Sequence, residues 1–436
     1  MDPSVFLPII KQVLNIFWQI FSVWWWLPLP FILFPQLKFI YEWYINDTYW
    51  SKANWMVLEV KIAKEIDRPL KAMEQVIANF WTLYDPADFK ERWFEGKYLL
   101  NFSLEIASID GKIHFFIYLP GVMRKAFESA IYSQYPEVEI EQAMDYTRMV
   151  PQDIPNRDWD MWACNFKMMK KRCYPIKTYL NFFEPTQEIE EERRVDPLAV
   201  LLEGMSRLKV GEQLWFQIVL KPILLDNEND WKVEGREELA KLLKRPVPGK
   251  DDRTILGEAF NLLVHDQEPF KDTEEKAEPL LPPELHLSPG EKDMVQAIEN
   301  KMAKHGFEAT VRMVLLGKKD VFFKPNLRLV LNLSSGVSTI NLNGLKPFMT
   351  TKVVAPAFFR NQRIYIKKRK LFVRYRSRWG YYFPKHVKGQ NHGHIILNPE
   401  EIATLWHFPG KAAMPAAGLE TIESKKAGPP SNLPIG

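Results

Sequence analysis

Residues Tyr98–Leu119, YLLNFSLEIASIDGKIHFFIYL, decide the fold, because two strand-like runs flank an Asp-Gly pair. Asp110-Gly111 is typical of the tight turn of a β-hairpin, where both central residues adopt a left-handed backbone. The runs Tyr98–Ala107 and Lys112–Leu119 are rich in aromatic and β-branched residues, which favour strands. The stretch therefore predicts two antiparallel strands.

The segments on either side of this hairpin extend the pattern. Trp55–Ala63 (WMVLEVKIA) reads as a strand, and apolar residues then recur at helical spacing from Leu70 to Phe80, after Pro69. A second helix is predicted over 122–134, and Glu137–Asp145 follows as a strand. The apolar stripe of the second helix is expected to comprise Val122, Phe127, Ala130 and Ile131.

The resulting order β-α-β-β-α-β is that of the ferredoxin-like split βαβ motif. We expect a domain over residues 51–150, with a four-stranded sheet and two helices on one face. This fold hosts many functions, so it does not indicate an activity.

Residues 151–320 predict a second α/β domain of related design. Its expected helices begin near Asp196, Glu234 and Ser288, where Ser288 is a cap before Pro289. An acidic, proline-rich insertion occupies 245–289. The expected strands are Trp159–Lys170, Ile176–Phe183, Gln213–Leu220 and Phe307–Leu316. The predicted fold class is thus α+β, with ferredoxin-like units of which the second is decorated.

An apolar segment precedes these domains. Val13–Phe34 contains no charged side chain in 22 positions, and about 20 apolar residues span a bilayer. We predict a membrane anchor over 1–50 that contacts the membrane through 13–34. Pro28 and Pro30 leave two alternatives open: a re-entrant or interfacial segment, and an apolar face docked on a partner.

The expected location is the cytoplasmic membrane, with the body on the cytoplasmic side. Lys38 and Lys52 follow the apolar segment while only Lys11 precedes it, which agrees with the positive-inside rule. Cys164 and Cys173 are the only cysteines, and two thiols without a disulfide framework favour a reducing compartment.

The last part of the chain is strongly basic. Val321–Pro399 contains 15 Lys and Arg and no Asp or Glu. We predict a basic helical region over 321–410, followed by a linker or disordered tail over 411–436. Within it, Phe358–Trp379 is predicted to form one helix that includes Phe359, Ile366, Val373 and the basic residues around them.

This helix supplies the candidate site, a surface for a polyanion. Three interpretations stay open: a solvated helix packed on the body, binding of anionic lipid, and contact with nucleic-acid phosphates. The candidate binding residues are Arg360, Arg363, Lys367, Lys368, Arg369, Lys370, Arg374, Arg376 and Arg378.

Motifs that would indicate an enzyme are absent from the sequence. It contains no P-loop, no Gly-x-Ser-x-Gly elbow, no His-Glu-x-x-His and no dinucleotide fingerprint. His386, His392, His394 and His407 lie close in sequence but have no cysteine nearby, so a zinc site is not favoured. We therefore predict no catalytic residues, no cofactor and no metal.

Three stretches carry a resemblance to a known family. They are HFFIYLPGVMRKAFESAIYSQYPEVEIEQAMDYT (His114–Thr147), ILNPEEIATLWHFPG (Ile396–Gly410) and KKAGPPSNLPIG (Lys425–Gly436). With the aromatic first segment, they resemble the region that precedes the motor domain in conjugative-transfer ATPases of type IV secretion systems, within the HerA/FtsK superfamily.

The resemblance implies a non-catalytic, membrane-anchored component of a secretion or conjugation-like machine. In that family the motor would begin after the final linker, where this chain stops, so a separately encoded P-loop ATPase is the expected partner, and an oligomer is possible. The alternative is an autonomous, membrane-tethered nucleic-acid-binding protein that acts through the basic helix.

Overall fold

The computed structural model describes two compact units, Met1–Asn54 with Asp85–Leu100, and Trp55–Tyr84 with Asn101–Gly436. Most of the predicted acidic insertion, most of the predicted tail, and His386, His392 and His394 lie outside the described residues. The described residues are 3–24, 26–63, 66, 68–82, 85–182, 196–223, 230–243, 287–350, 359–378, 395–410, 418–419 and 421–422.

The predicted hairpin is confirmed. Strands β2 (Phe102–Ile109) and β3 (Lys112–Pro120) pair antiparallel down to Ile109 and Lys112. Asp110 and Gly111 have φ of 53° and 84°, the left-handed conformation that this turn needs. The local sequence alone therefore determines where the chain reverses.

Four more elements complete the first half of the sheet. They are β1 (Trp55–Ala63), α3 (Leu70–Trp81), α4 (Arg124–Gln134) and β4 (Glu139–Ala143). The strand order β4-β1-β3-β2, with antiparallel neighbours, is that of a ferredoxin-like unit. The prediction that Val122 belongs to the apolar stripe of this helix is wrong. Val122 is 94% exposed, because it lies in the 3₁₀ turn Gly121–Met123 before α4 begins.

The second half has the strand order β6-β7-β5-β8. If its strands are counted from β5 as those of the first half are from β1, this order is the reverse of β4-β1-β3-β2. Residues 223–306, which carry α6 (Asp230–Leu242) and α8 (Pro289–Ala303), connect β6 to β7. The elements of this half are β5 (Trp159–Met168), α5 (Ala199–Ser206), β6 (Glu212–Pro222), β7 (Phe307–Lys318), α9 (Arg328–Gly336) and β8 (Leu345–Thr350).

The two halves form one continuous sheet. β2 pairs with β6 antiparallel from Phe102–Leu220 to Ile109–Gln213. Two short strands, β9 (Ile395–Leu397) and β10 (Thr421–Ile422), add to β7 and β1 and complete a sheet of 10 strands. The strand β2, which would be an edge in an isolated ferredoxin-like unit, is therefore internal.

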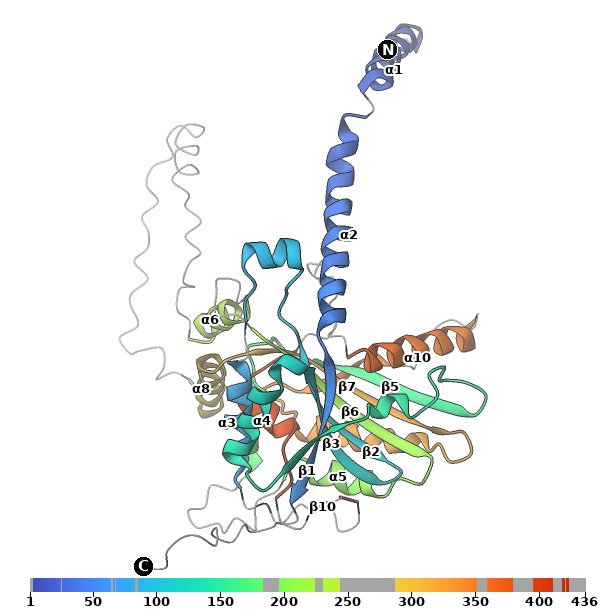
Figure 1. Ribbon diagram of the computed structural model, residues 1–436. Helices are drawn as coiled ribbons and strands as arrows, with labels where there is room; N and C mark the ends of the chain where they lie inside the picture. Colours follow the sequence, from blue (N-terminus) through green and yellow to red (C-terminus); the bar gives the residue numbers. More distant parts are fainter. Residues whose placement is uncertain are drawn as a thin grey trace, which may run out of the picture. The chain divides into compact units, whose positions relative to one another are not determined.

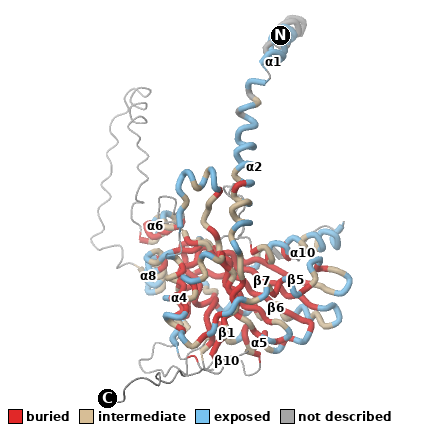
Figure 2. The backbone as a smooth tube through the Cα atoms, viewed as in Figure 1, coloured by how far each residue is buried: buried red, intermediate tan, exposed pale blue. Residues whose placement is uncertain are grey.

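The two faces of the sheet carry separate cores. Helices α3, α4, α5, α9 and α11 (Pro399–Leu405) cover one face through residues such as Phe80, Phe127 and Leu202. Helix α10 (Arg360–Arg376) covers part of the opposite face, as Figure 1 shows, together with Tyr146. The strands are largely buried between these layers, whereas the outer end of α10 is exposed (Figure 2).

The predicted strand Ile176–Phe183 is wrong. Tyr179–Phe182 forms a 3₁₀ turn, and the backbone donors of this segment bond elsewhere. The backbone N–H of Ile176 donates to Glu401, and that of Tyr179 donates to Thr404. The segment is held by α11 rather than by a neighbouring strand, which apolar composition alone does not reveal.

The predicted membrane segment is also wrong. No helix among the described residues combines the length and the apolar character needed to cross a membrane. The apolar run 13–34 is shared between α1 (Pro3–Trp24) and α2 (Pro28–Lys52), because the first helix ends before Pro28. The remainder of α2 carries Lys38, Glu42 and Asp47. The anchor and the location at the cytoplasmic membrane are therefore withdrawn.

In the first unit, α2 packs against residues 85–100. Gly96 ends the short helix Glu91–Glu95 with φ of 69°, and a Cβ built there would lie 2.3 Å from the backbone oxygen of Ile45. Tyr41 donates a hydrogen bond of 2.8 Å to the carbonyl of Trp93. This contact therefore depends on glycine at position 96.

Gly96→Ala is expected to loosen this unit, because the new methyl group requires the backbone of 85–100 to move away from α2. Amide hydrogen exchange in both segments should rise about tenfold or more, as expected for a local cost above about 1 kcal/mol. Gly290→Ala is the control, since nothing lies within 4 Å of a Cβ there. Unchanged exchange in Gly96→Ala would contradict the packing.

Candidate functional site

Helix α10 rests on the sheet through its C-terminal half. Leu371, Phe372 and Tyr375 are buried and pack against Trp215 and neighbouring strand residues. Phe359, Ile366 and Val373, from which the helix was predicted, are 67%, 51% and 53% exposed. The helix is thus confirmed, but a different face of it packs on the body.

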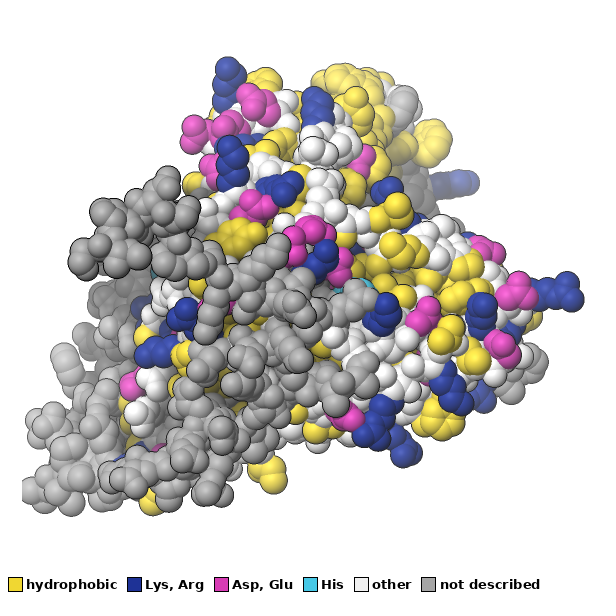
Figure 3. Space-filling model, turned by 60° about the horizontal axis from the view of Figure 1, so that its bottom comes forward, with side chains coloured by type: hydrophobic (Ala, Val, Ile, Leu, Met, Phe, Trp, Pro, Cys, Tyr) yellow, Lys and Arg dark blue, Asp and Glu magenta, His cyan; other side chains and the backbone are white. Residues whose placement is uncertain are grey.

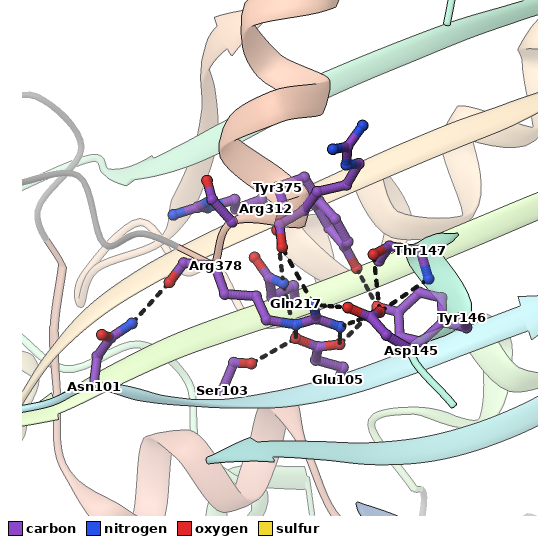
Figure 4. A network of polar contacts seen from close by, with 12 residues as sticks. Asn101, Ser103, Glu105, Asp145, Tyr146, Thr147, Gln217, Arg312, Tyr375 and Arg378 are labelled. Atoms are coloured by element: carbon purple, nitrogen blue, oxygen red, sulfur yellow. Dashed lines mark hydrogen bonds and ion pairs between the residues drawn. The ribbon is translucent and has the colours of Figure 1, made fainter. Parts of the chain in front are cut away.

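Arg378, just beyond the end of α10, fixes that end to the sheet (Figure 4). Its Nε donates to Glu105 Oε1 at 2.8 Å, and its Nη1 and Nη2 donate to the two carboxylate oxygens of Asp145 at 2.7 and 2.9 Å. The side chains of Arg378 and Glu105 are only 1% and 0% exposed. Burial opposes the charge on Arg378, yet the two carboxylates hold its pKa well above its ordinary value.

Other polar groups complete this buried network. Glu105 accepts from Ser103 Oγ at 2.5 Å, from Gln217 Nε2 at 2.8 Å and from the hydroxyl of Tyr146 at 2.7 Å. The hydroxyls of Tyr146 and Tyr375 lie 3.0 Å apart. Burial, followed by the nearby charge of Glu105, raises the pKa of both tyrosines, so both stay neutral hydrogen-bonding groups.

The register of the sheet explains why these residues meet. Glu105 is the direct partner of Phe116 on one side and of Gln217 on the other, and Gln217 is the partner of Arg312. Directly opposed residues share a face, so Glu105, Gln217 and Arg312 form a polar row beneath the end of α10. Glu105, the single charged residue of β2, was the available sequence signal, and the sequence analysis did not use it.

The structure divides the nine candidate residues into two groups. Arg378 is buried in the network. Lys368 pairs with Asp160, Arg369 donates to the carbonyl of Asp153, and Arg376 donates to the carbonyl of Gln152. These four residues hold α10 on the body.

The other five residues form a stripe along α10. Positions 360, 363, 367, 370 and 374 recur every three or four residues, which places them on one side of the helix. Over 14 residues this stripe is about 21 Å long at 1.5 Å per residue. We name it the basic stripe, and its members are Arg360, Arg363, Lys367, Lys370 and Arg374.

Four members of the basic stripe are available to a ligand. Arg360, Arg363, Lys367 and Lys370 make no hydrogen bond or ion pair with any residue that the structure describes. Lys367 is half-buried, and burial without an acidic partner lowers its pKa. Over the face in Figure 3, basic and acidic side chains intermingle among the coloured atoms. The basic stripe is therefore a local concentration of charge.

Two further polar pairs are buried and make no surface site. Lys301 and Glu401 form an ion pair of 3.1 Å with both side chains 0% exposed, and His407 lies 3.0 Å from Asp196. Within the described ranges, no group of three or more His, Cys, Asp or Glu could hold a metal ion. The basic stripe is thus the candidate site, and the expected contacts are with phosphates.

The comparisons with known proteins concern the sheet rather than this helix. A family model described as "Domain of unknown function (DUF8128)" matches residues 88–322. No curated protein matches the chain. These findings give no support to a role in secretion or conjugation, so that role is not kept. The separately encoded ATPase partner stays a prediction. Because the match covers more than half of the 436 residues, the chain belongs to the DUF8128 family.

Proposed function

We propose that this protein binds nucleic acid through the basic stripe of α10 and acts as a binding module rather than an enzyme. The observation that carries the proposal is the row of four cationic side chains, Arg360, Arg363, Lys367 and Lys370, without partners among the described residues. Anionic lipid, the other polyanion predicted from the sequence, stays the alternative ligand for these four side chains.

The geometry of the stripe fits a phosphate backbone. Successive members are separated by three or four residues, which is a rise of about 4.5–6 Å along the helix. Cations in such a row can each approach a phosphate of one strand and release its condensed counterions. Arg contributes a bidentate fork, and Lys contributes a compact point charge.

The buried network supports this function by holding the helix rigid. Arg378, Glu105 and Asp145 fasten one end of α10, and Lys368 with Asp160 fastens its middle. The cationic side chains then extend from a fixed backbone, so less conformational freedom is lost when a ligand binds. Direct reading of bases is not part of the proposal, because charge contacts of this kind are independent of sequence.

The test is binding of labelled 30-nucleotide single-stranded and duplex DNA, measured by fluorescence anisotropy across a salt series. Replacement of Arg360, Arg363, Lys367 and Lys370 by Gln should weaken binding about 100-fold and reduce the slope of log K against log salt by about 3–4. The unfolding free energy should change by less than about 0.5 kcal/mol, because these groups are not buried in ion pairs.

The matched control removes the same charge elsewhere. Lys71, Lys125, Lys209 and Lys292 are exposed, and replacement of all four by Gln should leave most of the affinity and the slope intact. Equal losses of DNA affinity in both variants would show that net charge alone, rather than the stripe, causes the effect. Failure of the unaltered protein to bind either DNA in 50 mM salt would reject the proposed function.

A further inference from the structure

Two lysines face each other at the edge of the sheet near α10. Lys167 of β5 and Lys346 of β8 are direct partners in the antiparallel register. Cβ atoms of such partners lie about 5 Å apart, and like charges at this separation destabilise a sheet. Neither lysine forms an ion pair with a described residue, so the described part of the chain supplies no compensating negative charge.

A neighbouring ring orients this pair. Nζ of Lys167 lies 4.8 Å from the centre of the ring of Phe348, two residues along β8 from Lys346. Lys346 is exposed, and Lys167 and Phe348 are half-buried. The three side chains therefore place two cations and an aromatic ring on one exposed patch, a combination that suits a nucleic-acid strand.

The patch lies on the face of the sheet that α10 occupies. Trp162, Cys164, Phe166 and Met168 point into the core on the other face, so Lys167 points toward the α10 side. It lies two residues beyond Asn165, which pairs with Arg312, and Arg312 donates to the carbonyl of Arg374 in α10.

Two arginine contacts also show which flank of α10 faces residues 152–153. Arg369 and Arg376, which contact Asp153 and Gln152, are seven residues apart and share one flank of the helix. The basic stripe lies on a different flank, away from the 152–153 contact. Lys368 pairs with Asp160 near the start of β5, whereas Arg374 is connected through Arg312 to Asn165, so the Arg374 end of the stripe is the end nearest to the lysine pair.

We propose that Lys167 and Lys346 are a second phosphate-binding point, and that one nucleic-acid ligand contacts both the basic stripe and this lysine pair. This inference rests on the proposed function and deepens it, because it gives the ligand a path from α10 onto the β5–β8 edge. The bound phosphates also relieve the repulsion between the two lysines.

The experiment compares Lys167→Gln/Lys346→Gln with Lys209→Gln/Lys292→Gln in the DNA titration described above. The first variant should reduce the salt slope by about 1.5 and weaken binding about tenfold, because each lost phosphate contact removes about 0.7–0.9 from the slope. The second variant should leave both quantities unchanged.

The unfolding free energy separates the ligand contact from a structural role. The free protein should keep its stability or gain slightly in Lys167→Gln/Lys346→Gln, since a like-charge repulsion is removed. If that variant binds DNA as the unaltered protein does, while the stripe variant does not, the second point is rejected and the proposed function stands. If the unaltered protein does not bind, both are rejected.

Discussion

Arg378→Met should lower the free energy of unfolding by about 3–5 kcal/mol, because it leaves Glu105 and Asp145 without their cation. Glu105 is 0% exposed and already accepts from Ser103, Gln217 and Tyr146, so no water can replace the guanidinium at low cost. Methionine retains much of the apolar volume, which keeps a cavity from dominating the result. Urea unfolding followed by tryptophan fluorescence would measure the difference.

Arg369→Met is the matched control for this prediction. It removes a cation from the same region of α10, but among the described residues Arg369 contacts only the carbonyl of Asp153 and the ring and hydroxyl of Tyr365 near the surface. Its cost should stay below about 1 kcal/mol. Equal costs for the two variants would contradict a specific role for the buried network.

The pH dependence provides an independent check on Arg378. Burial tends to raise the pKa of Asp145, but hydrogen bonds from Arg378 and Thr147 hold it below its ordinary value of 3.8. A carboxylate with a lowered folded pKa contributes stability above its unfolded pKa and loses it as the pH falls through the folded pKa. The difference in unfolding free energy between the unaltered protein and Arg378→Met should therefore become smaller below about pH 4.

Lys301→Met should cost about 3–5 kcal/mol for a related reason, since it leaves Glu401 as an uncompensated buried anion. Lys301 also donates to the carbonyls of Tyr174 and Ile396, so the pair links α8 to β9 and α11. Burial lowers the pKa of Lys301 and raises that of Glu401, which shows that both charges are held at a cost in solvation. Thermal or urea unfolding would measure the loss.

Lys304→Met, next to the same helix, is the control. Lys304 bridges Glu74 and Glu400, but its side chain is 32% exposed, so its loss should cost about 1 kcal/mol or less. The double variant Lys301→Met/Glu401→Gln should recover part of the stability, because glutamine removes the charge and keeps an acceptor for Ile176. Absence of recovery would indicate that packing, rather than charge, dominates at this site.

Local signals predicted much of the fold. Asp110-Gly111 determined the hairpin, and Ser288 and Asn398, each followed by proline, form the capping boxes that begin α8 and α11. These features act within four residues, so the sequence pattern contains the physical cause. The aromatic and β-branched composition of the two runs beside this turn did the same for β2 and β3.

Long-range contacts could not be predicted in this way. The basic residues of α10 look equivalent in sequence, but Arg378 is paired with Glu105, 273 positions away, while Arg360 stays exposed. The pairing of β2 with β6 likewise depends on two strands that lie more than 100 residues apart. The apolar first segment was misinterpreted because composition does not show where a helix ends before Pro28.

When the strands of each half are numbered along the chain, the order of the second half is the reverse of the first. The sheet therefore has an approximate two-fold symmetry about the junction of β2 and β6. Glu105 and Gln217 are direct partners where the two halves meet. In a homodimer, symmetry would force both halves to carry the same residues, so every carboxylate near the junction would occur twice. Joining the halves in one chain removes that constraint, so one half carries the carboxylate, the other carries the amide, and a single Arg378 suffices. Two halves joined in one chain can therefore carry a single basic helix, α10, whereas a symmetric homodimer would carry two.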